Sequence, residues 1–335
     1  MTIAIAGNFK WVHYQQALLD GFIKLGENDK SVQAVPIKVD YCSNWNLFGL
    51  LQNSIYLLSQ VRKQNVDVLF LYRLDYILPI VVYIIRHFCK CKILMYHNDD
   101  PYNRSTLRRR IKYFNFLHSI RYSDIVYVYR EVNINEALQW GGKVVKLMRA
   151  SYYSKLDKPQ ESRVQKDKKI VFIGHYEEDS RVVYLDALFK AGFPVHIYGH
   201  DNWNIVFEKY NWNKEFLHSP VYGSLYRETL SSSVAALAFF SKHNRDDYTR
   251  RCFEIPMAKT LLIAPATNFM RSVFHDGEDV ILFKDSVDLV NKVSQVLSDE
   301  DLFNKITQNG YDFVLNGGFS ENDMARAILS DIKKL

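Results

Sequence analysis

The chain has 335 residues, of which 48% are hydrophobic, 14% aromatic and 24% charged, with only 14 Gly and 8 Pro. This length allows two domains, and the composition excludes collagen-like, low-complexity and disordered proteins. The formal net charge of +6 is unevenly spread, because residues 1–150 carry 20 Lys and Arg against 11 Asp and Glu whereas the remainder is mildly acidic.

The first half of the chain has the pattern of strands alternating with helices. Continuous apolar runs of strand length lie at residues 2–6, 66–72, 92–96 and 125–129, and helical patterns lie at 47–62, 77–90 and 105–122. Strands that are apolar on both faces and alternate with helices predict a parallel, doubly wound sheet. The longest apolar stretch is about half as long as a membrane-spanning helix, so a soluble protein is expected.

The second half repeats this alternation after a polar segment. Residues 154–169 contain almost no apolar side chains, which indicates a linker. Strands are then predicted at 170–173, 195–198, 234–240 and 260–264, and helices at 179–191, 286–298, 300–310 and 320–334. Two Rossmann-like domains are therefore expected at 1–155 and 169–318, joined by a linker at 156–168, with a C-terminal helix at 319–335 that packs back on the N-terminal domain.

Three glycines stand where a predicted strand gives way to a loop, namely Gly7, Gly174 and Gly199. At such a place a glycine lets the backbone approach a ligand phosphate, although a tight turn alone also explains it. No G-x-G-x-x-G or P-loop motif is present, which disfavours classical NAD binding and NTPase chemistry. The four cysteines have neither the number for a disulfide framework nor the spacing of a zinc site, which favours the reducing cytoplasm.

Residues 246–265 form a polar loop, a short helix carrying Glu254 and a strand. A carboxylate followed by apolar residues is costly to bury without donors, and a ribose diol supplies two hydroxyl donors. Arg250 and Arg251 at the start of the helix place guanidinium groups where a diphosphate would be bound. Salt bridges on a helix surface are the alternative interpretation.

Residues 169–330 resemble the C-terminal half of the CgeB-like, spore-maturation-type glycosyltransferases. The resemblance rests on Arg181 and on the segments 169–175 (KIVFIGH), 195–199 (VHIYG), 251–256 (RCFEIP), 261–265 (LLIAP) and 274–280 (FHDGEDV). In the N-terminal half, residues 97–101 (HNDDP) are similar to the Asp-Asp-Pro of that family. The resemblance implies a GT-B fold, in which two Rossmann-like domains face a central cleft.

This family resemblance also implies the chemistry. It implies a glycosyltransferase that uses a nucleotide-diphosphate sugar, with Glu254 binding the ribose and Asp246, separated from it by seven residues, facing the sugar. Asp246 stands where the family pattern has Glu, and Lys259 stands where it has Gly. A retaining reaction is favoured over an inverting one, and no metal or other cofactor is expected. The residues expected to bind the donor are Gly7, Gly174, His175, Arg181, Gly199, Val221, Tyr222, Tyr248, Arg250, Arg251 and Glu254.

In the N-terminal domain, His97, Asp99 and Asp100 follow a predicted strand and are catalytic candidates. In an inverting reaction one of the aspartates deprotonates the acceptor hydroxyl, and in a retaining reaction these residues orient the sugar. A turn that caps the next helix is the alternative interpretation.

A basic cluster follows, comprising Arg104, Arg108, Arg109 and Arg110. Such a run is usually a solvated face, but it also suits a phosphorylated acceptor lipid or an anionic bilayer, with Tyr113, Phe114 and Phe116 as interfacial anchors.

Three functional classes are compared. The favoured one is a cytoplasmic glycosyltransferase, in peripheral contact with the inner face of the membrane, whose acceptor is a glycan, a lipid-linked glycan or a protein. The second is a catalytically silent protein of the same fold that binds a sugar nucleotide or polysaccharide. The third, a nucleic-acid-binding protein, is disfavoured because no nucleic-acid motif is present.

Overall fold

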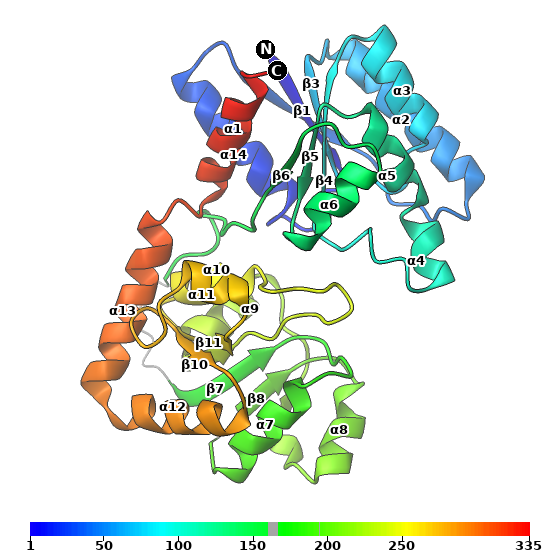
Figure 1. The fold of residues 1–335 in the computed structure, drawn as a ribbon. Coiled ribbons are helices and arrows are strands. Elements are labelled where there is room, and N and C mark those ends of the chain that lie inside the picture. The colour runs from blue at the N-terminus through cyan, green and yellow to red at the C-terminus, as the bar shows by residue number, and fades with distance from the viewer. Residues whose placement is uncertain (160–166, 194) are drawn as a thin grey trace. The chain divides into compact units, whose positions relative to one another are not determined.

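The computed structural model describes residues 1–159, 167–193 and 195–335, so most of the predicted linker at 156–168 lies outside the described residues. The chain divides into two units (Figure 1). The first unit contains Met1–Tyr153 and Ser320–Leu335, and the second unit contains Ser154–Phe319.

The first unit is built on six parallel strands in the order β2-β1-β3-β4-β5-β6. The strands are β1 (Thr2–Gly7), β2 (Gln33–Lys38), β3 (Val68–Tyr72), β4 (Lys92–His97), β5 (Ile125–Val128) and β6 (Val145–Leu147). Strands β3 and β5 are buried along their whole length because helices cover both faces of the sheet. Strand β2 contains Pro36, which lacks an N–H and is tolerated because β2 lies at the edge.

The helices of the first unit are α1 (Gln15–Asn28), α2 (Leu47–Lys63), α3 (Pro79–Phe88), α4 (Leu107–Lys112), α5 (Phe114–Ser119), α6 (Val132–Gln139) and α14 (Glu321–Ile332). The prediction of one helix at 105–122 is wrong, because the segment is divided into α4, α5 and a 3₁₀ turn at Ile120–Tyr122. The break lies at Tyr113, whose backbone leaves the helical region so that its ring can be buried.

The second unit has its own six parallel strands, in the order β12-β11-β10-β7-β8-β9. They are β7 (Asp167–Ile173), β8 (Val195–Tyr198), β9 (Leu217–His218), β10 (Ser233–Leu237), β11 (Leu261–Pro265) and β12 (Ile281–Phe283). The helices are α7 (Arg181–Lys190), α8 (Trp203–Tyr210), α9 (Gly223–Ser231), α10 (Arg251–Met257), α11 (Asn268–Val273), α12 (Ser286–Ser298) and α13 (Glu300–Asn316). Two doubly wound parallel sheets confirm the predicted fold class.

The C-terminal helix α14 belongs to the first unit, where it lies beside α1 (Figure 1). Its Asp331 accepts hydrogen bonds from the hydroxyl of Tyr127, at 3.0 Å, and from Nζ of Lys146, at 2.5 Å. The two helices approach most closely at Gly21, where a Cβ atom would lie 2.5 Å from the carbonyl oxygen of Glu321. The last segment of the chain therefore completes the layer over the first sheet.

We expect Gly21→Val to lower the free energy of unfolding of the first unit by about 1–3 kcal/mol, because the side chain overpacks the contact between α1 and α14. Urea denaturation measures this effect. The matched control is Lys24→Val, at an exposed position of the same helix, which should leave the transition unchanged. An unchanged midpoint for Gly21→Val would contradict the close approach.

Candidate functional site

Three polar rings lie in a row across the strand ends of the second unit. His175 follows β7, His200 follows β8, and Tyr222 follows β9. The two imidazole rings stack with their centroids 5.1 Å apart and their planes 5° from parallel, and the Tyr222 hydroxyl lies 3.1 Å from Nε2 of His200. All three residues are exposed, so this row presents ring faces and edges that a planar ligand can contact.

Gly174 and Gly199 lie next to this row and are explained by protein packing. A Cβ atom on Gly199 would lie 2.3 Å from the ring of Trp203, and one on Gly174 would lie 2.8 Å from the ring of Phe172. The indole N–H of Trp203 donates a hydrogen bond to the Gly174 carbonyl, at 3.0 Å. An aromatic ring therefore fills the space that a side chain would need at either glycine, and contact of these glycines with a phosphate stays a prediction.

Glu254 lies on α10, after β10, and both of its oxygens face a donor. The hydroxyl of Tyr226 donates to Oε2 at 2.9 Å, and Nη1 of Arg250 lies 3.2 Å from Oε1. Burial, reinforced by the negative charge of Glu254, raises the pKa of Tyr226 well above its ordinary value, so this hydroxyl stays protonated and donates. The protein thus supplies the donors that a carboxylate needs at this half-buried position.

Arg250 is buried, and its second partner is Asp157, with which it forms a buried ion pair. Asp157 falls in the segment where the sequence predicts a linker, and its burial shows that the start of that segment is part of the second unit. The polar composition of residues 154–169 concealed this contact, because a single buried aspartate leaves no periodic signal. Asp157, Arg250 and Glu254 form a line of alternating charges that holds the Glu254 carboxylate in place.

Arg251 lies beside this line and is half-buried. Its Nε atom is buried and has no hydrogen-bond partner among the described residues. Burial, followed by the charges of His200 and Arg251, lowers the pKa of His175. A buried guanidinium N–H without an acceptor is costly, and an anionic oxygen would satisfy it.

Four other predicted donor-site residues are held by the protein itself. Both carboxylate oxygens of Asp179 bind the buried guanidinium of Arg181, each at 2.7 Å, and the His175 carbonyl accepts from Nη1 of Arg181 at 2.5 Å. Tyr248 is buried and stacks on Phe269, with ring centroids 3.9 Å apart. Val221 is buried, and Asp246 is half-buried in the loop between β10 and α10. Arg181 therefore stabilises the loop that carries His175, and Tyr248 packs the loop before α10 against α11.

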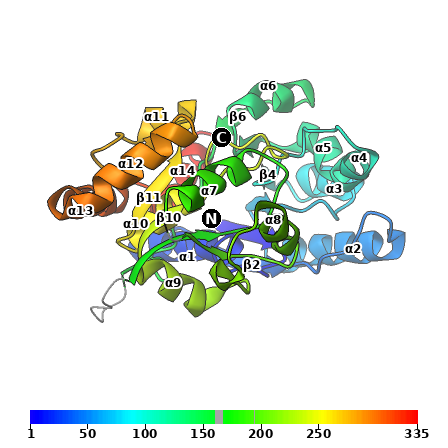
Figure 2. The same ribbon diagram turned by 90° about the horizontal axis from the view of Figure 1, so that it is seen from below.

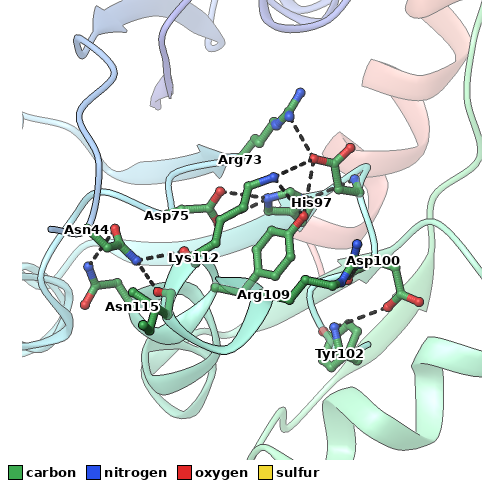
Figure 3. A network of polar contacts seen from close by, with 12 residues as sticks. Asn44, Arg73, Asp75, His97, Asp100, Tyr102, Arg109, Lys112 and Asn115 are labelled. Atoms are coloured by element: carbon green, nitrogen blue, oxygen red, sulfur yellow. Dashed lines mark hydrogen bonds and ion pairs between the residues drawn. The ribbon is translucent and has the colours of Figure 1, made fainter. Parts of the chain in front are cut away.

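In the first unit, His97 ends β4 and is fixed through both ring nitrogens (Figure 3). The backbone N–H of Asp99 donates to Nδ1 at 3.0 Å, so Nε2 carries the proton and donates to a carboxylate oxygen of Asp75 at 3.1 Å. His97 and Asp75 are both buried. This ring therefore orients the loop after β4.

Asp99 accepts hydrogen bonds from three side chains through one oxygen. Nη2 of Arg73 lies at 2.7 Å, Nζ of Lys112 at 3.4 Å and the hydroxyl of Tyr113 at 3.5 Å (Figure 3). Burial opposes ionisation, but the positive charges of Arg73 and Lys112 outweigh it and hold the pKa of Asp99 well below its usual range. Arg73 follows β3 with a left-handed φ of 57°, an unfavourable conformation for arginine that the surrounding contacts maintain.

Asp100 and Gly7 are placed inside the fold. Asp100 is fully buried, and its Oδ1 accepts from the backbone N–H groups of Tyr102 and Asn103 and from the side chain of Asn133. A Cβ atom on Gly7 would lie 2.6 Å from the side chain of Gln15. These placements explain Asp100 by the turn and Gly7 by packing, whereas Asp99 keeps an exposed edge.

In the basic cluster, Arg109 is hydrogen-bonded to the preceding loop and the other three arginines are exposed. Arg109 binds the loop before α4, because its Nε donates to the Asn103 carbonyl at 2.8 Å and its Nη2 to the Asp100 carbonyl at 2.6 Å. Arg104, Arg108 and Arg110 are exposed. Among the three predicted interfacial anchors only Phe114 is exposed, whereas Tyr113 and Phe116 are buried in the core, so the prediction is wrong for these two.

The described residues contain neither a cluster of metal ligands nor a membrane-spanning helix. No three His, Cys, Asp or Glu side chains group as metal ligands within residues 1–159, 167–193 and 195–335. None of the helices in this part of the chain has the length and hydropathy of a membrane span.

Residues 181–330 match a family described as "Glycosyl transferase-like". HepE of Anabaena, solved with UDP, is 12% identical, with a TM-score of 0.68 and full coverage of both chains. A sucrose-phosphate synthase of Thermosynechococcus elongatus is 12% identical over 100% of this chain and 98% of that one, with a TM-score of 0.69. A glycosyltransferase of Rickettsia africae is 15% identical over 99% of this chain and 98% of that one, with a TM-score of 0.67. No curated protein matches in sequence. These structural similarities are similarities of fold.

We expect Asp157→Asn to lower the free energy of unfolding of the second unit by about 2–3 kcal/mol, because Arg250 stays buried with one carboxylate in place of two. Urea denaturation measures the change. The control is Glu208→Gln, which removes an exposed ion pair with Lys214 and should have no measurable effect. Equal stabilities of the two variants would contradict the role of the buried pair.

We also expect Arg251→Gln to raise the pKa of His175, because removing a neighbouring positive charge favours the protonated ring. Two-dimensional NMR of the histidine side chains measures the shift. His118 is the internal reference, since burial and then Arg121 and Arg104 lower its pKa in the first unit. An unmoved His175 pKa would show that Arg251 points elsewhere in solution.

Proposed function

We propose that this chain, a glycosyltransferase of the GT-B fold, transfers a sugar from a nucleotide-diphosphate donor to a glycan, a lipid-linked glycan or a protein. The second unit would bind the donor and the first unit the acceptor. Among glycosyltransferases we propose the CgeB-like type, on the segments of residues 169–330 that resemble it.

One observation carries the donor proposal: the buried, unpartnered Nε–H of Arg251 lies on the same helix as the carboxylate of Glu254. A diphosphate oxygen would accept from Arg251, and ribose hydroxyls would donate to the remaining lone pairs of Glu254. The row formed by His175, His200 and Tyr222 would then contact the nucleoside through its rings. Charge on the leaving diphosphate would be neutralised by Arg251, so we propose a reaction that needs no metal.

The first unit supports a retaining reaction. A general base works best with a pKa near the operating pH, and the low pKa of Asp99 makes it a weak one. His97 is equally unsuited, since Asp75 and the Asp99 backbone occupy both ring nitrogens. Asp99, Arg73 and Lys112 are instead arranged to bind sugar hydroxyl groups. We therefore propose that these residues orient the acceptor and that no protein base deprotonates it.

The location of the reaction follows from the charge of the first unit. Residues 1–150 are strongly basic, and the exposed arginines 104, 108 and 110 lie on and before α4. We propose a cytoplasmic enzyme whose basic first unit lies against the inner face of the membrane, where lipid-linked acceptors are found.

Two variants separate the parts of the donor site when they are titrated calorimetrically with nucleoside diphosphates and with pyrophosphate. Arg251→Gln should lower the affinity for both ligands about tenfold or more, because one charged hydrogen bond is lost. Glu254→Gln should lower the affinity for the nucleoside diphosphate to a similar degree. It should leave the affinity for pyrophosphate unchanged, since pyrophosphate has no ribose. Arg271→Gln and Glu228→Gln, at exposed positions, are the matched controls.

Unchanged affinity in both site variants would refute the donor site. Binding of a sugar nucleotide without donor hydrolysis or transfer would refute the enzymatic proposal and favour the silent binding protein. Circular dichroism of each variant distinguishes lost contacts from lost folding.

A further inference from the structure

Helix α2 is apolar on two faces, and only one of them is buried in the core. Leu50, Leu57 and Val61 pack into the hydrophobic core of the first unit. On the other face Leu47, Phe48, Leu51 and Ile55 recur at helical spacing and are exposed, with Phe48 at 78%. Trp45, immediately before the helix, is 75% exposed. A soluble surface rarely leaves so many large apolar side chains together without a partner.

The charge of this region is one-sided. Residues 41–61 contain no charged side chain at all, and residues 101–123 contain no Asp or Glu. Exposed basic groups in the second segment come from Arg104, Arg108 and Arg110. A partner that complements this region must therefore combine apolar material with negative charge.

The two segments adjoin at the start of α2. The side-chain amide of Asn44 donates to the carbonyls of Ile111 and Lys112, at 2.6 and 2.7 Å, which fixes the start of α2 against α4. A pocket of about 220 Å³ lies between them, lined by Leu50, Ile111 and Phe114 and by Arg104 and Arg110. Helices α2 and α4 lie on the same side of the first unit in both views (Figures 1 and 2). We call this region the α2–α4 surface.

We propose that the α2–α4 surface docks on an anionic lipid bilayer. Trp45, Leu47, Phe48 and Leu51 enter the interfacial layer, and Arg104, Arg108 and Arg110 bind lipid phosphates. Tryptophan and phenylalanine beside arginines have the amphipathic character that this layer favours. The inference deepens the proposed membrane contact of the first unit and does not involve the donor site.

A second copy of the chain fits this surface less well. In a two-fold dimer the same patch contacts itself, so the three arginines would face the three arginines of the partner without an acidic residue between them. A bilayer containing anionic lipid has no such conflict, because its charge is uniformly negative and its interior is apolar.

The test is sedimentation of the full chain with vesicles of phosphatidylcholine alone and with added phosphatidylglycerol. The wild-type chain should bind only the anionic vesicles, and less strongly as salt rises. Arg108→Gln and Arg110→Gln should each lower the partition coefficient about fivefold, because this is the effect of one basic residue near a charged surface. Trp45→Ser combined with Phe48→Ser should weaken it tenfold or more.

Matched controls lie elsewhere on the chain. Ile205→Ser and Val287→Ser remove large exposed side chains from the second unit, and Lys24→Gln and Lys30→Gln remove charges from another part of the first. All four should bind as the wild type does. Brominated lipid chains should quench tryptophan fluorescence in the wild type and quench it less in Trp45→Phe.

The proposal is overturned if the chain does not bind anionic vesicles, or if the surface variants and the controls lose binding equally. It is also overturned if the wild type is dimeric and the surface variants are monomeric, because the surface then binds a second copy. Nucleotide binding that persists in the surface variants leaves the donor proposal intact, so the two ideas fail separately.

Discussion

Parallel pairing of all strands within each sheet is the constraint on which the described sites depend. Since every strand of a sheet points the same way, the loops that follow the strands meet at one edge. In the second unit this brings together His175, His200 and Tyr222 from three loops that are distant in sequence. In the first unit it brings Arg73, after β3, to Asp99, after β4. Neither group would form on a sheet of mixed direction.

Charge burial at these edges holds the site side chains in position. Arg250 lies between the carboxylates of Asp157 and Glu254, and Asp99 accepts from Arg73 and Lys112. Arg250 and Asp99 each have an opposite charge within contact distance, which offsets much of the desolvation cost. A ligand bound to Glu254 therefore meets a carboxylate already held in position, so little conformational entropy is lost on binding. Arg251 differs, because its buried Nε lacks such a partner among the described residues.

The sequence predicted the parts of the fold that have a strong periodic signal. Strand β8 and helix α12 match their predicted limits because their apolar runs are bounded by glycine or polar residues. Strand β2 was missed since Pro36 reads as a break, and the split of α4 from α5 depends on burying Tyr113, a tertiary effect. In the site, motifs singled out Glu254, Arg250 and Asp99, but their respective partners Tyr226, Asp157 and Arg73 come from distant segments with no local pattern. The aromatic rings that fill the space beside Gly174 and Gly199 cannot be located from sequence, so the packing reason for these glycines appears only in the structure.

Helix α2 shows why composition alone could not separate the core from the surface. Its apolar residues cover two faces, yet among the described residues only the face with Leu50, Leu57 and Val61 packs into the core of the first unit. An exposed face with no charge costs solubility, and nothing in the folding of the first unit requires it. The exposed arginines contribute less to the fold than Arg109, which binds the Asn103 and Asp100 carbonyls, since Arg110 adds one hydrogen bond to the preceding loop, from its Nε to the Arg104 carbonyl at 3.0 Å. An exposed apolar face that carries no charge and adjoins exposed basic groups is best explained by a partner that is apolar and negatively charged.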